Sequence, residues 1–468
     1  MQAFVTIAEL YPWTDPATKS TENRRPSKGG QNALAEQRKA DVHVFALGFR
    51  KVGSRNPFRW QRSCIWVTYL AFMVAIAGCP KPRVEPLVGE PTPASPEERK
   101  LWERAQKIVA ALEKEKVLEP EPKLNEYLRG VAHRLLPYFR LHPGGIRSYV
   151  LKDPFLNAGS LPNGSLIFTQ GLLAHLDDEA QLACVVGHEL AHVSGRHALL
   201  DEQYGERART AVGSVLGVLI VVSGGAVALP GPSVFADLLA GDNGSLLASQ
   251  LRGFRKELEH EADQRGWEAV RAAGYEVRAC TEVLQLLLEQ EQELVADKLV
   301  REPYFYGDHP ATSERLTKLT EWLQRRSDPG PSQGERRRES FQEAIASLRI
   351  QVAETNMKIR RFQRARRLID RHLAAFPTRP DGYMALGEWY RRHPTEGNAT
   401  LAAQAYRKAL DLDGTFAPAH REMALLCLDQ GDSECARRHL LAYLELAPSA
   451  LDRPIAIKML RELEGGTP

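Results

Sequence analysis

The sequence predicts an α+β fold, mainly helical with a small sheet, followed by an all-α repeat solenoid. Short strand patterns, "IRSYVLKD" and "SLIFT", stand among longer stretches that have the apolar spacing of helices. Beyond residue 340, a helix–turn–helix unit recurs with a period of about 34 residues. The 468 residues, 43% of them hydrophobic and 26% charged, are enough for two or three domains with buried cores.

Residues 1–78 are predicted to be an N-terminal extension and a lipoprotein signal peptide. Arg55, Arg59 and Arg62 precede an apolar run, and the "IAGC" at its end is similar to a bacterial lipobox, in which the cysteine is lipidated. We therefore expect a lipid anchor on Cys79. The alternative, a plain transmembrane anchor, needs ~20 apolar residues, and the run over 65–77 is shorter than that.

The residues that follow predict an exported protein of the bacterial cell envelope. Residues 79–96 are a Pro-rich tether that would hold the folded part away from a membrane. Pro80 stands where an inner-membrane retention signal would usually have Asp, which favours the periplasmic face of the outer membrane. The net charge of +3 arises in residues 1–78, which carry 11 Lys+Arg and 5 Asp+Glu, so the chain has no charge excess that would favour binding to nucleic acid.

The six cysteines are too few for a dense disulfide framework. Cys64 and Cys79 belong to the signal. Cys184 and Cys280 lie in apolar surroundings, where we expect buried free thiols. The remaining two, Cys427 and Cys435, could form a local pair.

Residues 97–323 are predicted to form one domain. Apolar spacing indicates helices over 97–141, and the two strand patterns follow, the second of them over 165–169 after a Pro-Asn-Gly turn. Asp177 or Asp178 can then cap a helix with the sequence "EAQLACVVGHELAHVS".

An apolar stretch over 210–230 carries no charged residue. Its length would suffice for a membrane-spanning helix. A single crossing would separate the chain before it from the chain after it, and the next segment contains Asp237 and Asp242, which disfavour a second crossing. We therefore expect a buried or interfacial helical hairpin, with a spanning pair as the alternative.

The motif that carries chemistry is HExxH, at His188, Glu189 and His192. Histidines four residues apart project from one face of a helix, so both can bind one Zn²⁺, and Glu189 lies beside them as a base for a metal-bound water. A catalytic zinc site needs a third protein ligand. The sequence offers two candidates for that ligand.

His197 follows closely, but the pattern HExxHxxGxxH would place a histidine at position 198, which is Ala198. The rival is "ELEHEADQRG", in which Glu259 can bind the metal while Asp263, one helical turn later, accepts a hydrogen bond from a ligand histidine. His260 and Glu261 point to other faces of that helix and are expected to be structural.

Residues 324–340 are a polar linker rich in Pro and Gly, and residues 341–468 are predicted to be tetratricopeptide-like repeats. The repeated alanine stands at Ala365, Ala402 and Ala436. Three such units would bury a continuous core and leave a concave groove for a protein partner. A plain helical bundle is the alternative.

Four blocks resemble, in order, the HtpX and CAAX-prenyl-protease family of zinc metalloendopeptidases. They are "NAGSLPNGSLIFTQGLL", "EAQLACVVGHELAHVSGRHAL", "ELEHEADQRGWEAVRAAGYEV" and "DHPATSERLTKL". The order of lipoprotein signal, protease and repeat tail is similar to that of periplasmic, BepA-like members.

The resemblance implies a gluzincin-type site with one Zn²⁺ per chain, bound by His188, His192 and Glu259. It also implies that His309 and Arg315 hold the oxyanion of the tetrahedral intermediate or contact substrate. An exposed edge strand beside the HExxH helix would pair with the backbone of the substrate. The residues expected in that strand are Ser165, Leu166, Ile167 and Phe168.

The function expected from these patterns is zinc-dependent hydrolysis of peptide bonds in envelope proteins, with misfolded or misassembled outer-membrane proteins as substrates. The alternative is a chaperone-like assembly scaffold whose peptidase site is latent, because a repeat groove can bind partners without cleaving them.

Overall fold

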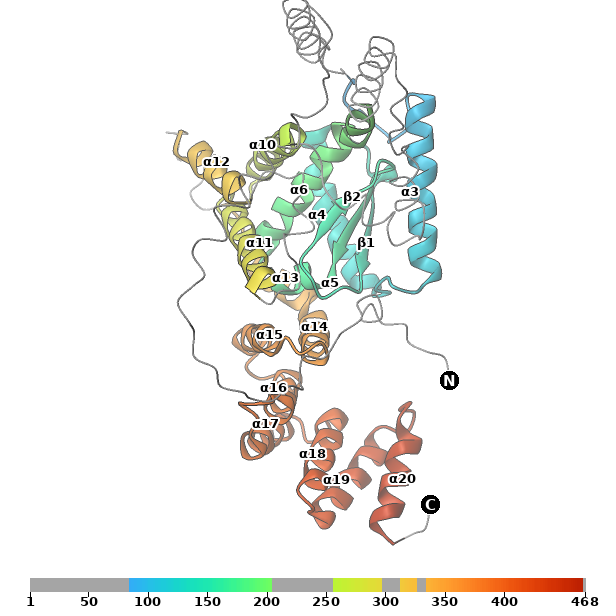
Figure 1. Ribbon diagram of the computed structural model, residues 1–468, viewed down its shortest axis with the longest axis vertical. Coiled ribbons are helices and arrows are strands. Elements are labelled where there is room, and N and C mark those ends of the chain that lie inside the picture. The colour runs from blue at the N-terminus through green and yellow to red at the C-terminus, as the bar shows by residue number, and fades with distance from the viewer. Residues whose placement is uncertain (1–83, 204–255, 297–311, 326–333, 466–468) are drawn as a thin grey trace, which may run out of the picture. The chain divides into compact units, whose positions relative to one another are not determined.

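The computed structural model describes residues 84–203, 256–296, 312–325 and 334–465 (Figure 1). The predicted signal peptide, Cys79, the apolar segment over 210–230 and His309 lie outside these residues. Within the described ranges, no helix has both the length and the apolar character needed to cross a membrane.

The described chain is mostly helical with one small sheet, as predicted. Its first part runs through α3 (Pro96–Lys114), α4 (Pro122–Phe139), β1 (Arg147–Leu151), β2 (Ala158–Ser160), β3 (Ser165–Thr169), α5 (Gln170–His175), α6 (Glu179–Ser194), α10 (Lys256–Ala272), α11 (Ala279–Ala296) and α12 (Thr312–Arg325). Its second part is all helical, with α13 (Arg338–Ala344), α14 (Ala346–Lys358), α15 (Phe362–Ala375), α16 (Pro380–Arg392), α17 (Ala399–Leu412), α18 (Ala417–Asp429), α19 (Ser433–Leu446) and α20 (Arg453–Leu463).

The sheet has the strand order β1-β3-β2, with β3 parallel to β1 and antiparallel to β2. The prediction that residues 165–168 form an exposed edge strand is therefore wrong, because β3 is the central strand. Leu166 and Phe168 pack into the main core with α4 and α6, while Ile167 packs into a second cluster with α3, which lies along the other side of the sheet (Figure 1). The strand beside α6 is β2.

The start of α6 is fixed as the sequence predicts. The side chain of Asp178 accepts a hydrogen bond from the backbone N–H of Gln181 at 3.0 Å, which satisfies one of the unpaired donors of the first turn. Arg336 then binds the other carboxylate oxygen of Asp178 at 2.9 Å. Arg336 also contacts Glu276 and Glu282, each at 2.6 Å, so the described end of the predicted linker is ion-paired to the first part of the chain.

Helices α6 and α10 cross at two glycines. A Cβ atom on Gly266 would lie 3.0 Å from the backbone nitrogen of His188, and one on Gly187 would lie 3.2 Å from the carbonyl oxygen of Gly266. Real Cβ atoms rarely approach backbone so closely, so any side chain larger than hydrogen would push the helices apart. The two glycines thus set how closely α10 approaches the HExxH motif.

The expectation of free thiols at Cys184 and Cys280 is wrong. These two residues form a disulfide between α6 and α11, with their Cα atoms 5.3 Å apart. The pairing joins positions separated by 96 residues in sequence, which local patterns do not reveal. Cys427 and Cys435 form a second disulfide, within the C-terminal helices.

The C-terminal helices are continuous with the first part of the chain. A single hydrophobic cluster extends from Leu87 through α6 to Trp389 in α16. The side chain of Arg349 in α14 is fully buried and donates to the carbonyls of Ala174 and Leu176, at 3.0 and 2.7 Å, at the end of α5. Burial lowers the pKa of Arg349 to about 10, and the guanidinium satisfies carbonyls that the helix end leaves unpaired.

Beyond α13 the helices are arranged as successive packed pairs, α14 with α15, α16 with α17, and α18 with α19. The recurring residues Ala365, Ala402 and Ala436 lie in the second helix of each pair and are fully buried. In the middle pair, a Cβ on Gly387 would lie 2.3 Å from the ring of Tyr406, so glycine is needed for that contact. Small residues therefore determine how closely the paired helices approach.

Two buried carboxylates share one arginine in this region. Arg391 donates to Glu388 at 2.9 Å and to Glu422 at 3.3 Å, and both glutamates are buried. Burial raises the pKa of Glu422, and the neighbouring Glu388 raises it further. Glu422 therefore retains a proton in the folded protein at pH values where an exposed glutamate is ionised.

We predict that Gly266→Ala lowers the free energy of unfolding by about 1–3 kcal/mol, because the added methyl group overpacks the crossing of α6 and α10. The matched control is Gly130→Ala in α4, where a Cβ would meet nothing within 4 Å. That change should stabilise by about 0.5–1 kcal/mol, since alanine is the better helix former. Urea unfolding of both variants checks the opposite signs, and equal effects would contradict the packing argument.

We predict that Glu422→Gln reduces the loss of stability on going from pH 5 to pH 8. An unfolded glutamate has a pKa of about 4.3, and the folded pKa of Glu422 is higher, so unfolding in this range releases a proton and stability falls as pH rises. Removing the titration should raise stability at pH 8 relative to pH 5 by on the order of 1 kcal/mol. Urea unfolding at both pH values, with the exposed Glu445→Gln as control, measures the difference.

Candidate metal centre

The centre is built on α6, which presents His188, Glu189 and His192 within one turn. Glu189 and His192 are buried, and the side chain of His188 is 15% exposed. The Nε2 atoms of the two histidines lie 3.0 Å apart, because residues four apart project from one helix face.

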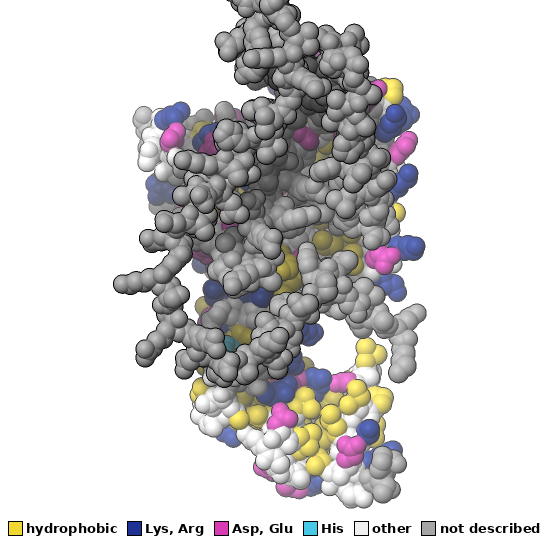
Figure 2. Space-filling model, in the orientation of Figure 1, with side chains coloured by type: hydrophobic (Ala, Val, Ile, Leu, Met, Phe, Trp, Pro, Cys, Tyr) yellow, Lys and Arg dark blue, Asp and Glu magenta, His cyan; other side chains and the backbone are white. Residues whose placement is uncertain are grey.

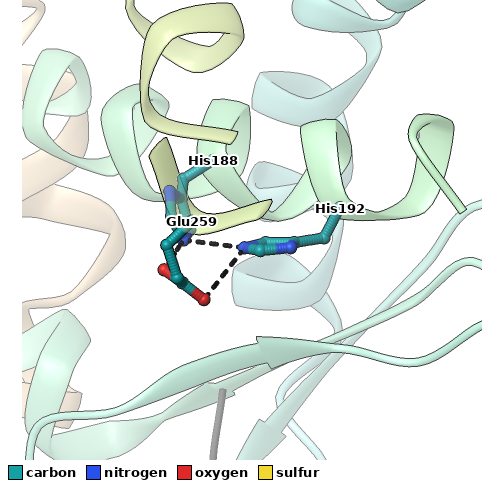
Figure 3. Close-up of side chains that lie close together, drawn as sticks. All are labelled: His188, His192 and Glu259. Atoms are coloured by element: carbon teal, nitrogen blue, oxygen red, sulfur yellow. Dashed lines mark hydrogen bonds and ion pairs between the residues drawn. The ribbon is translucent and has the colours of Figure 1, made fainter. Parts of the chain in front are cut away.

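Helix α10 supplies the third group. The carboxylate of Glu259 lies with Oε2 3.4 Å from Nε2 of His188 and Oε1 3.6 Å from Nε2 of His192. Figure 3 shows the three side chains directed toward one another, the histidines from α6 and the glutamate from α10. The sequence proposed two candidates for the third position, and the structure brings Glu259 to it.

The three donor groups suit a metal ion. One atom from each residue lies within 4.8 Å of the others. Tetrahedral sites with bonds of ~2.0–2.1 Å have ligand atoms about 3.3 Å apart, close to the separations found here. Burial and Arg315 lower the pKa of His188, while hydrogen bonds with Asp263 and Glu259 raise it, with a net rise to about 10. The surroundings of His188 therefore favour a positive charge, which a bound metal ion would supply.

The residues around His188 fix its orientation. Oδ1 of Asp263 lies 3.0 Å from Nδ1 of His188, the contact that the spacing of Glu259 and Asp263 predicts. Arg315 in α12 binds the same carboxylate through two hydrogen bonds, of 2.7 and 2.9 Å. A histidine whose Nδ1 proton is held in this way presents its Nε2 lone pair to the centre.

Residues 122–323 match the model of peptidase family M48. These residues form a peptidase family M48 domain. The match confirms the family resemblance that the four sequence blocks indicate, and it contains α6, α10 and α12, the helices that supply the centre.

Similar curated proteins include the "Beta-barrel assembly-enhancing protease" of Escherichia coli (strain K12), which is 26% identical over 200 residues, covering 42% of this chain and 38% of that protein. The protein of the same name from Yersinia pestis is 27% identical over 199 residues, with the same coverage. The "Mitochondrial metalloendopeptidase OMA1" of Schizosaccharomyces pombe is 25% identical over 175 residues, covering 37% of this chain and 46% of that protein. The chain thus spans less than half the length of these relatives.

Glu189, which the HExxH motif predicts as the base, lies beside His188 on α6 and is buried. Burial raises the pKa of its carboxyl, while His188 and the hydroxyl of Ser160 lower it. Ser160 ends β2, so this short strand reaches the centre. The sequence patterns do not predict β2, because three small residues carry no alternation, and its position beside α6 becomes visible only in the fold.

The other predicted residues of the M48 domain divide into three groups. Arg315 lies at the centre and is bound to Asp263. His197 is not one of the clustered metal-binding residues. Its Nδ1 lies 2.8 Å from Nδ1 of His192, the ring nitrogen of His192 that does not face the centre. The predicted substrate-binding residues 165–168 are buried in the central strand, because α3 covers one face of the sheet and α4 and α6 the other.

We predict that one equivalent of Zn²⁺ or Co²⁺ raises the thermal midpoint of the chain, because the ion binds the folded state alone. Glu259→Ala should abolish this stabilisation, since two histidines remain on one helix with no third ligand. Differential scanning fluorimetry with and without metal measures the shift. Glu257→Ala, an exposed change in the same helix, should leave it intact.

Proposed function

We propose that the protein is a zinc-dependent metalloendopeptidase tethered in the bacterial cell envelope. The observation that carries the proposal is the convergence of His188, His192 and Glu259, with Glu189 beside them, inside an M48 domain. Two histidines, one carboxylate and a neighbouring glutamate are the set that peptidase zinc sites use.

His188, His192 and Glu259 would hold the zinc. When bound there, Zn²⁺ lowers the pKa of a water molecule and polarises the scissile carbonyl. Glu189, with its pKa raised by burial, accepts the proton of the attacking water and delivers it to the leaving amine. Asp263 and Arg315 keep His188 oriented, and a direct contact of Arg315 or His309 with the oxyanion is the further role that the family resemblance implies.

The substrate backbone would pair with β2. The carbonyl of Asn157 accepts from the backbone of Thr169, and the backbone N–H of Leu161 donates to Ser165, so the antiparallel alternation turns the backbone groups of Ala158 and Ser160 away from β3. An extended peptide added at this edge would lie near Glu189, because the hydroxyl of Ser160 in β2 is close enough to lower the pKa of Glu189. Binding through main-chain groups gives affinity with little sequence specificity, which suits the cleavage of misfolded proteins.

The envelope setting is supported by independent features. The sequence predicts lipidation of Cys79, and two disulfides are typical of exported proteins. The name of the bacterial relatives refers to assembly of β-barrels. We therefore propose misfolded or misassembled outer-membrane proteins as substrates, on the periplasmic face of the outer membrane.

The C-terminal helix pairs are proposed to be tetratricopeptide repeats that bind a protein partner. Hydrophobic side chains gather on the C-terminal part of the molecule in Figure 2. Exposed large hydrophobics in the helices α19 and α20 and the segment between them are Leu441, Leu446, Leu451 and Ile455. These residues also suit the second candidate, a chaperone-like scaffold with a latent peptidase site, because a scaffold needs a surface for partners.

The experiment that separates the two functions compares wild type with Glu189→Gln. We predict that wild type binds one Zn²⁺ and cleaves an unfolded outer-membrane protein, whereas Glu189→Gln binds Zn²⁺ normally and reduces cleavage by at least a factor of about 100. Zinc content by atomic absorption and fragments on denaturing gels provide the readouts.

Cleavage that is equal in the two proteins would contradict the role of Glu189. Zinc binding without cleavage in either protein would favour the scaffold. Exposed His133→Ala serves as the control for both readouts, because His133 lies on α4 and is not one of the clustered metal-binding residues.

A further inference from the structure

We infer that His197 positions His192 as a metal ligand, and that the turn at residues 195–197 is shaped to hold it there. The inference rests on the proposed metal site and adds to it the residue that fixes the second histidine. His197 is fully buried, and its Nδ1 lies 2.8 Å from Nδ1 of His192. Nε2 of His192 faces the other way, toward His188 and Glu259.

The protonation pattern follows from these contacts. A histidine that binds a metal through Nε2 carries its proton on Nδ1, so His192 donates and Nδ1 of His197 accepts. His197 then carries its own proton on Nε2, which lies 3.8 Å from Oε1 of Glu261. His192 thus donates and His197 accepts, and the carboxylate of Glu261 lies near the Nε2 end of His197 at a distance longer than a hydrogen bond.

The chain turns sharply to bring His197 under His192. Helix α6 ends at Ser194, and Arg196 adopts a left-handed conformation with φ of 53°, which is costly for a residue other than glycine. A Cβ on Gly195 would lie 2.3 Å from Nε2 of His197, so the imidazole packs directly on the backbone of Gly195. Glycine is needed here to leave space for the ring, not for its backbone freedom.

A buried ion pair holds this turn. Arg196 binds the carboxylate of Glu98, which lies in the first turn of α3 and is 3% exposed. The same carboxylate accepts a hydrogen bond from the backbone of Ala94 at 2.7 Å. The backbone of Leu87 donates to the carbonyl of Ser194 at 2.8 Å. Contacts from residues 87–98 thus stabilise the strained turn on which His197 lies.

The geometry therefore gives two histidine ligands with different supports. Asp263 orients His188, and His197 orients His192. A histidine acceptor lacks the charge of a carboxylate, so its contribution comes from fixing the ring and its tautomer. Loss of such a support typically weakens metal affinity by about 10- to 100-fold.

The test measures the zinc dissociation constant by competition with a chromophoric chelator in the full chain. His197→Leu removes the acceptor and should weaken binding by about 10- to 100-fold. His197→Asn places an amide oxygen near the former Nδ1 position and should retain affinity close to that of wild type. Gly195→Ala keeps His197 but displaces its ring, and should weaken binding in the direction of the leucine variant.

Exposed His133→Ala is the control for loss of a histidine, and urea unfolding of the zinc-free proteins shows whether each variant folds. Equal affinity in all variants would overturn the inference. Equal weakening in the leucine and asparagine variants would also overturn it, because the role would then be packing rather than hydrogen bonding. Failure of wild type to bind zinc would instead contradict the proposed function.

Discussion

The close crossing of α6 and α10 is the constraint on which the metal centre depends. HExxH provides two nitrogen donors on one helix, and no third donor of the centre comes from that helix. Gly187 and Gly266 let the backbones approach until Glu259 reaches both histidines and Asp263 reaches His188. The separation of the two helix backbones limits how far the side chains of α10 can reach. Gly187 and Gly266 therefore determine the geometry of the metal-binding side chains.

Charged residues buried around α6 extend this constraint. Glu179, in the first turn of α6, accepts hydrogen bonds from Tyr127 and Tyr275 at 2.5 and 2.6 Å. Asp178 is bound by Arg336, and a disulfide holds Cys184. Burying a charge costs free energy unless the charge is paired. A shift of α6 along its axis would separate these pairs, so they favour one position of the helix. The histidines therefore lie on a helix held at its start, its middle and its C-terminal turn.

The parts of the site that the sequence predicts are those with local spacing. His188 and His192 are one turn apart, as are Glu259 and Asp263, and helical geometry alone places each pair on one face. The cap at Asp178 is equally local. The sequence does not predict features that depend on distant pairing. Residues 165–169 have the pattern of a strand, but such a pattern does not show which strands lie beside it. β2 is too short to have a recognisable strand pattern in the sequence. The disulfide between Cys184 and Cys280 is hidden for the same reason.

The shared core of the M48 domain and the C-terminal helices has a consequence for how the protein can be divided. The hydrophobic cluster passes from the domain into α14, α15 and α16 without a break, and Arg349 is buried against α5. Removal of every residue after 340 would expose this apolar surface and leave the carbonyls of Ala174 and Leu176 without the guanidinium that binds them. Loss of the proposed activity on such a truncation would reflect damage to the M48 domain as much as loss of the proposed partner-binding surface. Variants that test partner binding separately from the M48 domain should therefore change residues in α18–α20, beyond the helices that share the core.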